Sequence, residues 1–190
     1  MVGVRTWIFR VLVLGAGGLL LYTFFQYWWT VEIFEVGRDV VVVYPYGLEA
    51  YIPLEYTSYI EGATMPAWFA PLMFIYLGLC IGGILYATFF KDRNIKLIGR
   101  VFNLNRLIIG LVGFSYIVVV TAAVIMISIR AAEYFDTPLT GFFNIVLGAA
   151  EYSGAESLLT FDYWLACAVG PLLLVLALLR NIIIGNTKTK

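Results

Sequence analysis

The chain has 190 residues, of which 62% are hydrophobic and only 13% are charged, and its 12 basic side chains balance its 12 acidic ones. Soluble domains are about 45–50% apolar and about 25% charged, so this composition excludes an ordinary soluble enzyme and a disordered chain. Two cysteines are too few for a disulfide scaffold, and the lack of histidine excludes metal sites and catalytic triads built on imidazole.

Four long apolar stretches predict membrane-spanning helices. A helix needs about 20 mainly apolar residues to cross a bilayer, and in hydrocarbon its backbone must satisfy its own hydrogen bonds. The predicted spans lie at about 7–27, 67–90, 107–130 and 163–184. We therefore expect an all-α membrane protein, in which residues 1–190 form one four-helix transmembrane bundle.

The charged residues predict how the chain is threaded. Ten of the 12 basic residues lie near the termini or in the loop at 91–106, whereas 11 of the 12 acids lie in the loops at 30–66 and 131–162. Because basic residues favour the cytoplasmic side, we expect both termini and the 91–106 loop to be cytoplasmic and the other two loops to be extracytoplasmic. No Asn-x-Ser/Thr sequence occurs, which favours a prokaryotic cytoplasmic membrane.

The loop at 30–66 is predicted to be rich in β-structure. Two β-branched runs, at 31–36 and 40–44, flank a glycine-containing turn and predict a hairpin, with a weaker strand at 48–52. A lone hairpin is only marginally stable, so we expect this one to pack against the loop at 131–162 or against a partner. Four aromatic residues of the loop are candidate partner contacts, although they could instead pack on each other or on lipid headgroups: Phe34, Tyr44, Tyr46 and Tyr51.

The other two loops are predicted to be partly helical. In the loop at 131–162, Thr137 can act as an N-cap with Pro138 at the first helical position, which predicts a short interfacial helix over 138–148. The alternative is a re-entrant segment, which would line a pathway. The basic loop at 91–106 has apolar residues at helical spacing and predicts a helix along the inner membrane surface, where its cations could attract anionic lipids.

Glycines in the first two spans are candidate helix-packing residues, because small residues let helix backbones approach closely. Gly78 and Gly82 form a GxxxG pattern with Gly83 beside them, and the first span contains Gly15, Gly17 and Gly18 close together. We expect contact between these two spans, with contact between molecules as the alternative.

The sequence offers no catalytic, cofactor-binding or metal-ligating set. No Asp, Glu or Lys lies inside a predicted span, where an ionisable residue usually marks an ion or proton path. Cys80 and Cys167 do not form a C-x-x-C pair, and they differ in predicted depth by too much for a disulfide.

These features predict a non-catalytic accessory subunit of a larger membrane complex, for example an oxidoreductase or energy-converting complex whose metals lie in other subunits. The expected partners are membrane lipids and other integral-membrane subunits rather than nucleic acid. The alternative function is a small channel or transporter that uses the 138–148 segment as a re-entrant element.

Overall fold

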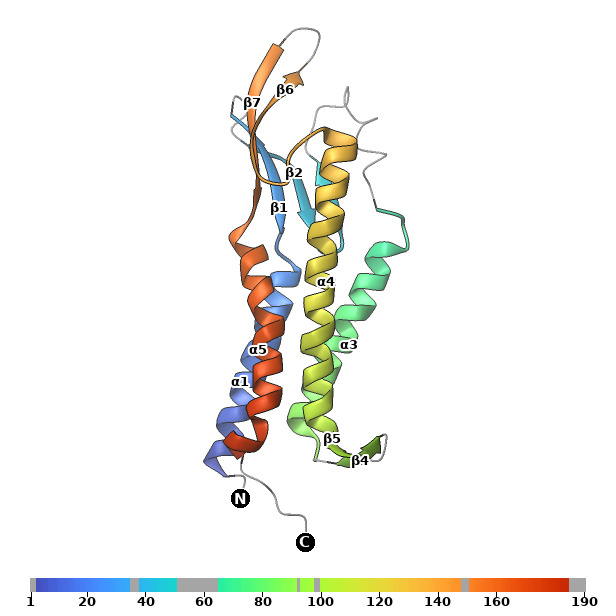
Figure 1. The fold of residues 1–190 in the computed structure, drawn as a ribbon, viewed down its shortest axis with the longest axis vertical. Helices are drawn as coiled ribbons and strands as arrows, with labels where there is room; N and C mark the ends of the chain where they lie inside the picture. Colours follow the sequence, from blue (N-terminus) through green and yellow to red (C-terminus); the bar gives the residue numbers. More distant parts are fainter. Residues whose placement is uncertain are drawn as a thin grey trace. The chain divides into compact units, whose positions relative to one another are not determined.

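The computed structural model describes residues 3–34, 38–50, 65–91, 93–97, 100–147 and 151–184 of the chain (Figure 1). Four of its helices are long and apolar enough to cross a membrane: α1 (Val4–Phe24), α3 (Phe69–Phe89), α4 (Leu104–Phe135) and α5 (Phe161–Ile184). Large apolar side chains such as Leu79 and Ile182 are about 70% exposed on these helices, where lipid rather than water is the favourable surrounding. The chain is therefore a mostly helical, multi-pass membrane protein that also carries a small sheet.

The chain divides into two compact units, which we describe separately. The first comprises Met1–Tyr22, Tyr76–Val119 and Ala166–Lys190, and the second comprises Thr23–Ile75 and Val120–Leu165. The first unit contains most of α1, α3 and α5, half of α4, and a hairpin of β4 (Asn94–Leu97) and β5 (Arg100–Asn103). The second contains a five-stranded sheet and the remaining turns of the helices.

Helices of the first unit approach each other closely at glycines. A Cβ atom added to Gly170 of α5 would lie 2.5 Å from Ile117 Cγ1 and 2.9 Å from the Gly113 carbonyl oxygen of α4. On α1, a Cβ added to Gly17 would lie 3.1 Å from Ile84 Cγ2 of α3. At Gly170 the two backbones therefore approach more closely than a side chain allows, and at Gly17 the Ile84 side chain packs directly against the backbone of α1.

The sheet of the second unit joins the two connections that follow α1 and α4. Its strands are β1 (Trp29–Ile33), β2 (Arg38–Tyr44), β3 (Gly47–Ala50), β6 (Gly141–Leu147) and β7 (Glu151–Leu159), in the order β3-β2-β1-β7-β6. All neighbouring strands are antiparallel, and β1 pairs with both β2 and β7. The first connection is therefore supported by the second, because β7 completes a sheet that a lone hairpin could not sustain.

One face of this sheet packs against α4. Trp29, Val31 and Val41 belong to a buried apolar cluster that also includes Ile127 and Ala131 of α4. The 32 residues of α4 give a helix about 48 Å long, whereas the hydrocarbon core of a bilayer is about 30 Å thick. The additional turns of α4 supply the apolar surface on which the sheet forms its core.

The expected architecture of four apolar helices with a small sheet is observed. Two expectations about the loops are wrong. The 138–148 segment is not an interfacial helix, because residues 141–147 form β6 and pair along their whole length with β7. A helix this short is marginal, whereas a stretch that contains two phenylalanines, an isoleucine and a valine suits a strand.

The second correction concerns the basic loop at 91–106. Residues 94–97 and 100–103 form the antiparallel strands β4 and β5 rather than a helix before α4 begins (Figure 1). Two of its apolar residues, Ile95 and Phe102, are directly paired across these strands.

Candidate functional site

The sheet carries a row of three residues on the face opposite the apolar cluster. Phe143 packs against that cluster, so its neighbour Phe142 lies on the other face, where it is 73% exposed. Across the strands, Phe142 is opposite Glu156 of β7, which is in turn opposite Glu32 of β1. Two like charges directly opposite each other destabilise a sheet, and a basic group outside it would relieve this repulsion.

Phe34, one of the predicted partner contacts, lies beside this row. Its ring centroid is 6.0 Å from that of Phe142, and its side chain is 51% exposed. The Phe34 amide donates a hydrogen bond to the Gly154 carbonyl at 3.0 Å, and a Cβ on Gly154 would lie 3.0 Å from the Phe34 ring. Glycine at 154 thus leaves room for the Phe34 ring beside β7. We call the surface formed by Phe34, Phe142, Glu156 and Glu32 the Phe142 face.

Strand β6 forms one edge of the sheet next to the Phe142 face. Within the described part of the chain, no strand pairs with the outer side of β6. Its sequence, GFFNIVL, contains neither a charge nor a proline. Proteins usually protect such edges with charged residues, prolines or bulges, because an open edge pairs readily with another chain.

Two of the other predicted partner contacts, Tyr44 and Tyr46, pack against aromatic rings of the same chain. The rings of Tyr44 and Tyr46 are stacked with centroids 5.2 Å apart, and Tyr46 also lies 5.2 Å from Phe74 and 5.6 Å from Phe24. Burial in this cluster, and secondarily the charge of Glu49, raises the pKa of the Tyr46 phenol. For these two residues the expected alternative, rings packing on each other, is the observed arrangement. Tyr51 lies outside the described residues.

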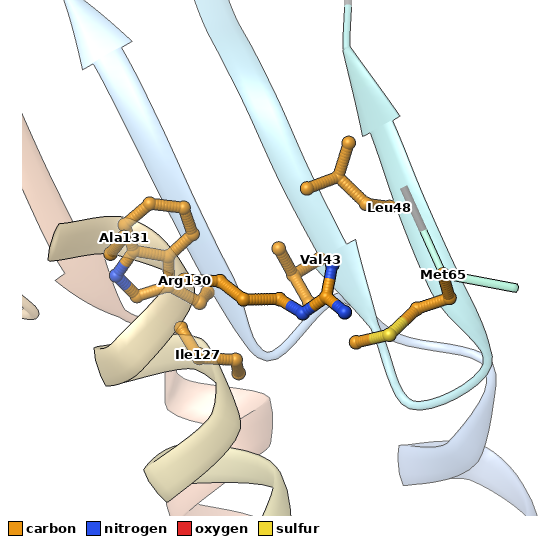
Figure 2. Close-up of a pocket in the computed structure, with 7 residues that line it drawn as sticks. Val43, Leu48, Met65, Ile127, Arg130 and Ala131 are labelled. Atoms are coloured by element: carbon orange, nitrogen blue, oxygen red, sulfur yellow. The ribbon is translucent and has the colours of Figure 1, made fainter. Parts of the chain in front are cut away.

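A small cavity lies between the sheet and α4 (Figure 2). Its volume is about 20 Å³, and it is lined mainly by apolar side chains, including Val43, Leu48 and Ile127. Figure 2 shows the Arg130 side chain extending from α4 toward Val43 and Met65. Small-molecule sites are usually about 300–1,000 Å³, so this cavity has room for a water molecule but not for a substrate.

Four of the glycines predicted to pack helices do not do so in this chain. A Cβ atom added to Gly15, Gly18, Gly78 or Gly82 would meet nothing within 4 Å. The expectation that they hold the first two spans together is therefore wrong, and α1 contacts α3 through Gly17 and Ile84 instead. Contact between molecules through these glycines stays a prediction.

Among the described residues, no three His, Cys, Asp or Glu side chains come together as a possible metal site. Cys80 is buried and Cys167 half-buried, and both are free thiols.

Comparison of the chain with protein-family models, with curated proteins and with solved structures gives no match.

Sequence reasoning missed Phe142 and Glu156, because it assigned a helix to residues 138–148 and no structure to residues 151–159. The signal was nevertheless present. Residues 141–147 contain two phenylalanines, an isoleucine and a valine in a stretch of strand length rather than helix length, and the stretch begins at a glycine.

Proposed function

We propose that the chain is a non-catalytic subunit of a larger integral-membrane assembly and that it binds its partner through the Phe142 face and the adjacent edge of β6. The observation that carries this proposal is the exposed pair Phe34 and Phe142 beside an uncharged edge strand. Aromatic residues are enriched in protein interfaces, and partner strands commonly add to open sheet edges.

The charges of the same surface favour a particular kind of partner. Glu32 and Glu156 are half-buried and face each other across β1 and β7. A partner that places a basic side chain between them would remove their repulsion and gain complementarity. We therefore propose that the partner presents at least one Lys or Arg next to an apolar patch.

We further propose that the assembly lies in a prokaryotic cytoplasmic membrane, with both termini in the cytoplasm and the sheet on the extracytoplasmic side. The support is the distribution of charge along the sequence, with ten basic residues near the termini or in the 91–106 loop and 11 acids in the other two loops. A complex that performs oxidoreduction or energy conversion, with its metals in other subunits, remains our proposed setting.

The alternative function, a small channel or transporter, depended on a re-entrant segment at 138–148. It required residues 138–148 to re-enter the membrane, whereas residues 141–147 form a strand within the five-stranded sheet. We therefore do not propose this alternative.

The test is to purify the tagged chain from native membranes in mild detergent and to measure its size and its co-purifying chains. We expect a complex with stoichiometric integral-membrane partners that mass spectrometry identifies. The double substitution Phe34→Ser/Phe142→Ser should weaken retention of those partners at least tenfold, because buried aromatic anchors dominate binding energy.

The matched control is Phe161→Ser, which removes another exposed phenylalanine (77% exposed) at the start of α5. It should leave the complex intact. A wild-type chain that runs as a clean monomer, or partners that are retained equally by the double variant, would contradict the proposal.

A further inference from the structure

The β4–β5 hairpin and its flanking residues form the most basic segment of the chain. Residues 91–106 contain five basic side chains and a single acid, Asp92. Three of the cations, Lys91, Arg93 and Lys96, are exposed. They are therefore available to a ligand outside the chain.

Hydrogen bonds fix this hairpin to the ends of two helices. The Leu104 amide donates to the Arg93 carbonyl at 2.8 Å. The Asn105 side chain, only 2% exposed, donates through Nδ2 to the carbonyls of Ala87 at 3.1 Å and Phe90 at 3.0 Å. These bonds join the last turn of α3 to the first turn of α4. The exposed cations are thus held at the ends of two helices that are suited to crossing a membrane.

Exposed aromatic rings lie immediately before the cations in the chain. Phe89 and Phe90 are each 61% exposed, and the Phe90 ring stacks on Tyr86 with centroids 4.8 Å apart. Aromatic rings at a helix end favour the boundary between hydrocarbon and headgroups. The segment therefore combines an apolar surface for the glycerol and acyl region with cations at headgroup level.

We propose that the β4–β5 hairpin binds the phosphodiester of an anionic phospholipid through Lys91, Arg93 and Lys96, while Phe89 and Phe90 contact the lipid below its headgroup. Charge complementarity selects an anionic lipid over a zwitterionic one, and the position of the hairpin at two membrane-helix ends selects a lipid over a soluble polyanion. The positive-inside tendency accounts for the number of cations in this segment, but not for their attachment to the helix ends beside exposed rings. This proposal requires only that α3 and α4 cross the bilayer, and it is independent of the proposed partner interface.

The experiment titrates the full chain in non-ionic detergent with dioctanoyl-phosphatidylglycerol or dioctanoyl-phosphatidylcholine and counts bound lipids by native mass spectrometry. The wild-type chain should bind phosphatidylglycerol about 100-fold more tightly than phosphatidylcholine, since each of the three cations contributes about fivefold. The triple variant Lys91→Gln/Arg93→Gln/Lys96→Gln should weaken phosphatidylglycerol binding by about 100-fold, or about fivefold per cation, and leave phosphatidylcholine binding unchanged.

Two matched variants separate this site from general charge and from misfolding. Arg5→Gln/Lys188→Gln/Lys190→Gln removes the same number of cations elsewhere and should change phosphatidylglycerol binding less than threefold. The exchange Lys91→Arg/Arg93→Lys/Lys96→Arg keeps the charge and should keep the affinity. Excess inorganic phosphate should not displace the lipid, because phosphate lacks the apolar contacts.

Four results would overturn the proposal. These are equal wild-type affinity for the two lipids, an equal loss of phosphatidylglycerol binding in the control triple variant, a loss of binding in the charge-conserving exchange, and full displacement of the lipid by inorganic phosphate.

Discussion

At the scale of single residues, hydroxyl and indole groups connect the sheet to the helix ends. The Trp29 indole donates to the Leu139 carbonyl at 2.7 Å, and the Trp28 indole donates to the Thr23 carbonyl at 2.8 Å. Thr160 hydroxyl donates to the Tyr27 carbonyl at 2.6 Å and accepts a hydrogen bond from the Tyr163 amide at 3.3 Å. Thr160 is therefore the N-cap of α5, and its hydroxyl also hydrogen-bonds the segment that follows α1.

We predict that Thr160→Ala lowers the free energy of unfolding by about 1–2 kcal/mol, since it removes a helix cap and leaves a carbonyl without its donor. Thr160→Ser keeps the hydroxyl and should lose less than half of that amount. Thermal or denaturant unfolding of the purified chain in detergent measures both. If the serine variant is as unstable as the alanine variant, the hydroxyl is not the stabilising group.

Thr137 shows why a local motif can indicate the wrong element. The sequence Thr137-Pro138 resembles a helix start, yet the Thr137 amide and hydroxyl both donate to the Ala131 carbonyl, at 3.1 Å and 3.3 Å. Asp136 adopts φ 48°, the left-handed conformation that often follows a helix. Thr137 thus caps the end of α4 rather than the beginning of a new helix.

At the scale of elements, α4 and α5 are held together by a close approach of backbones. We predict that Gly170→Ala lowers the free energy of unfolding by about 1–3 kcal/mol, because the new methyl group would overlap Ile117 and the Gly113 carbonyl. Gly82→Ala is the matched control. Nothing lies within 4 Å of its added Cβ, so we expect no loss, or a gain of about 0.5–1 kcal/mol from replacing a helical glycine.

Both variants are compared by thermal unfolding in the same detergent. A loss at Gly82 similar to that at Gly170 would instead point to a contact between molecules through the GxxxG pattern. That result would support the alternative interpretation, in which Gly78 and Gly82 form a contact between two molecules.

At the scale of the whole molecule, the neutral net charge is the sum of two groups of loops with opposite charge. The basic residues predict that both termini lie on one side of the membrane and that this side is cytoplasmic. We predict that Glu49→Cys, on β3 at the other edge of the sheet from β6, reacts with a membrane-impermeant thiol reagent in intact cells, whereas Asn94→Cys reacts only after the cells are permeabilised. Both parent residues are exposed on the chain. The wild-type chain, with Cys80 and Cys167, gives the background, and the reverse labelling pattern would show the opposite threading.

The sequence by itself determined the spans, because an apolar run of about 20 residues has one stable state in hydrocarbon. It also indicated strands near 31–36 and 40–44, because two β-branched runs on either side of a glycine-containing turn favour strands over a helix. The structure has β1 at 29–33 and β2 at 38–44.

Only the tertiary structure decided the remaining elements. The aromatic and β-branched residues of 141–147 favour a strand, but a strand this short forms only where a partner strand is present, and β7 supplies that partner. The glycines at the contact between α4 and α5, Gly113 and Gly170, could not be selected from among 18 glycines, because the choice depends on which helix faces meet. Likewise, Phe34 and Phe142 lie 108 positions apart in the chain, and only the β1–β7–β6 pairing brings their rings together.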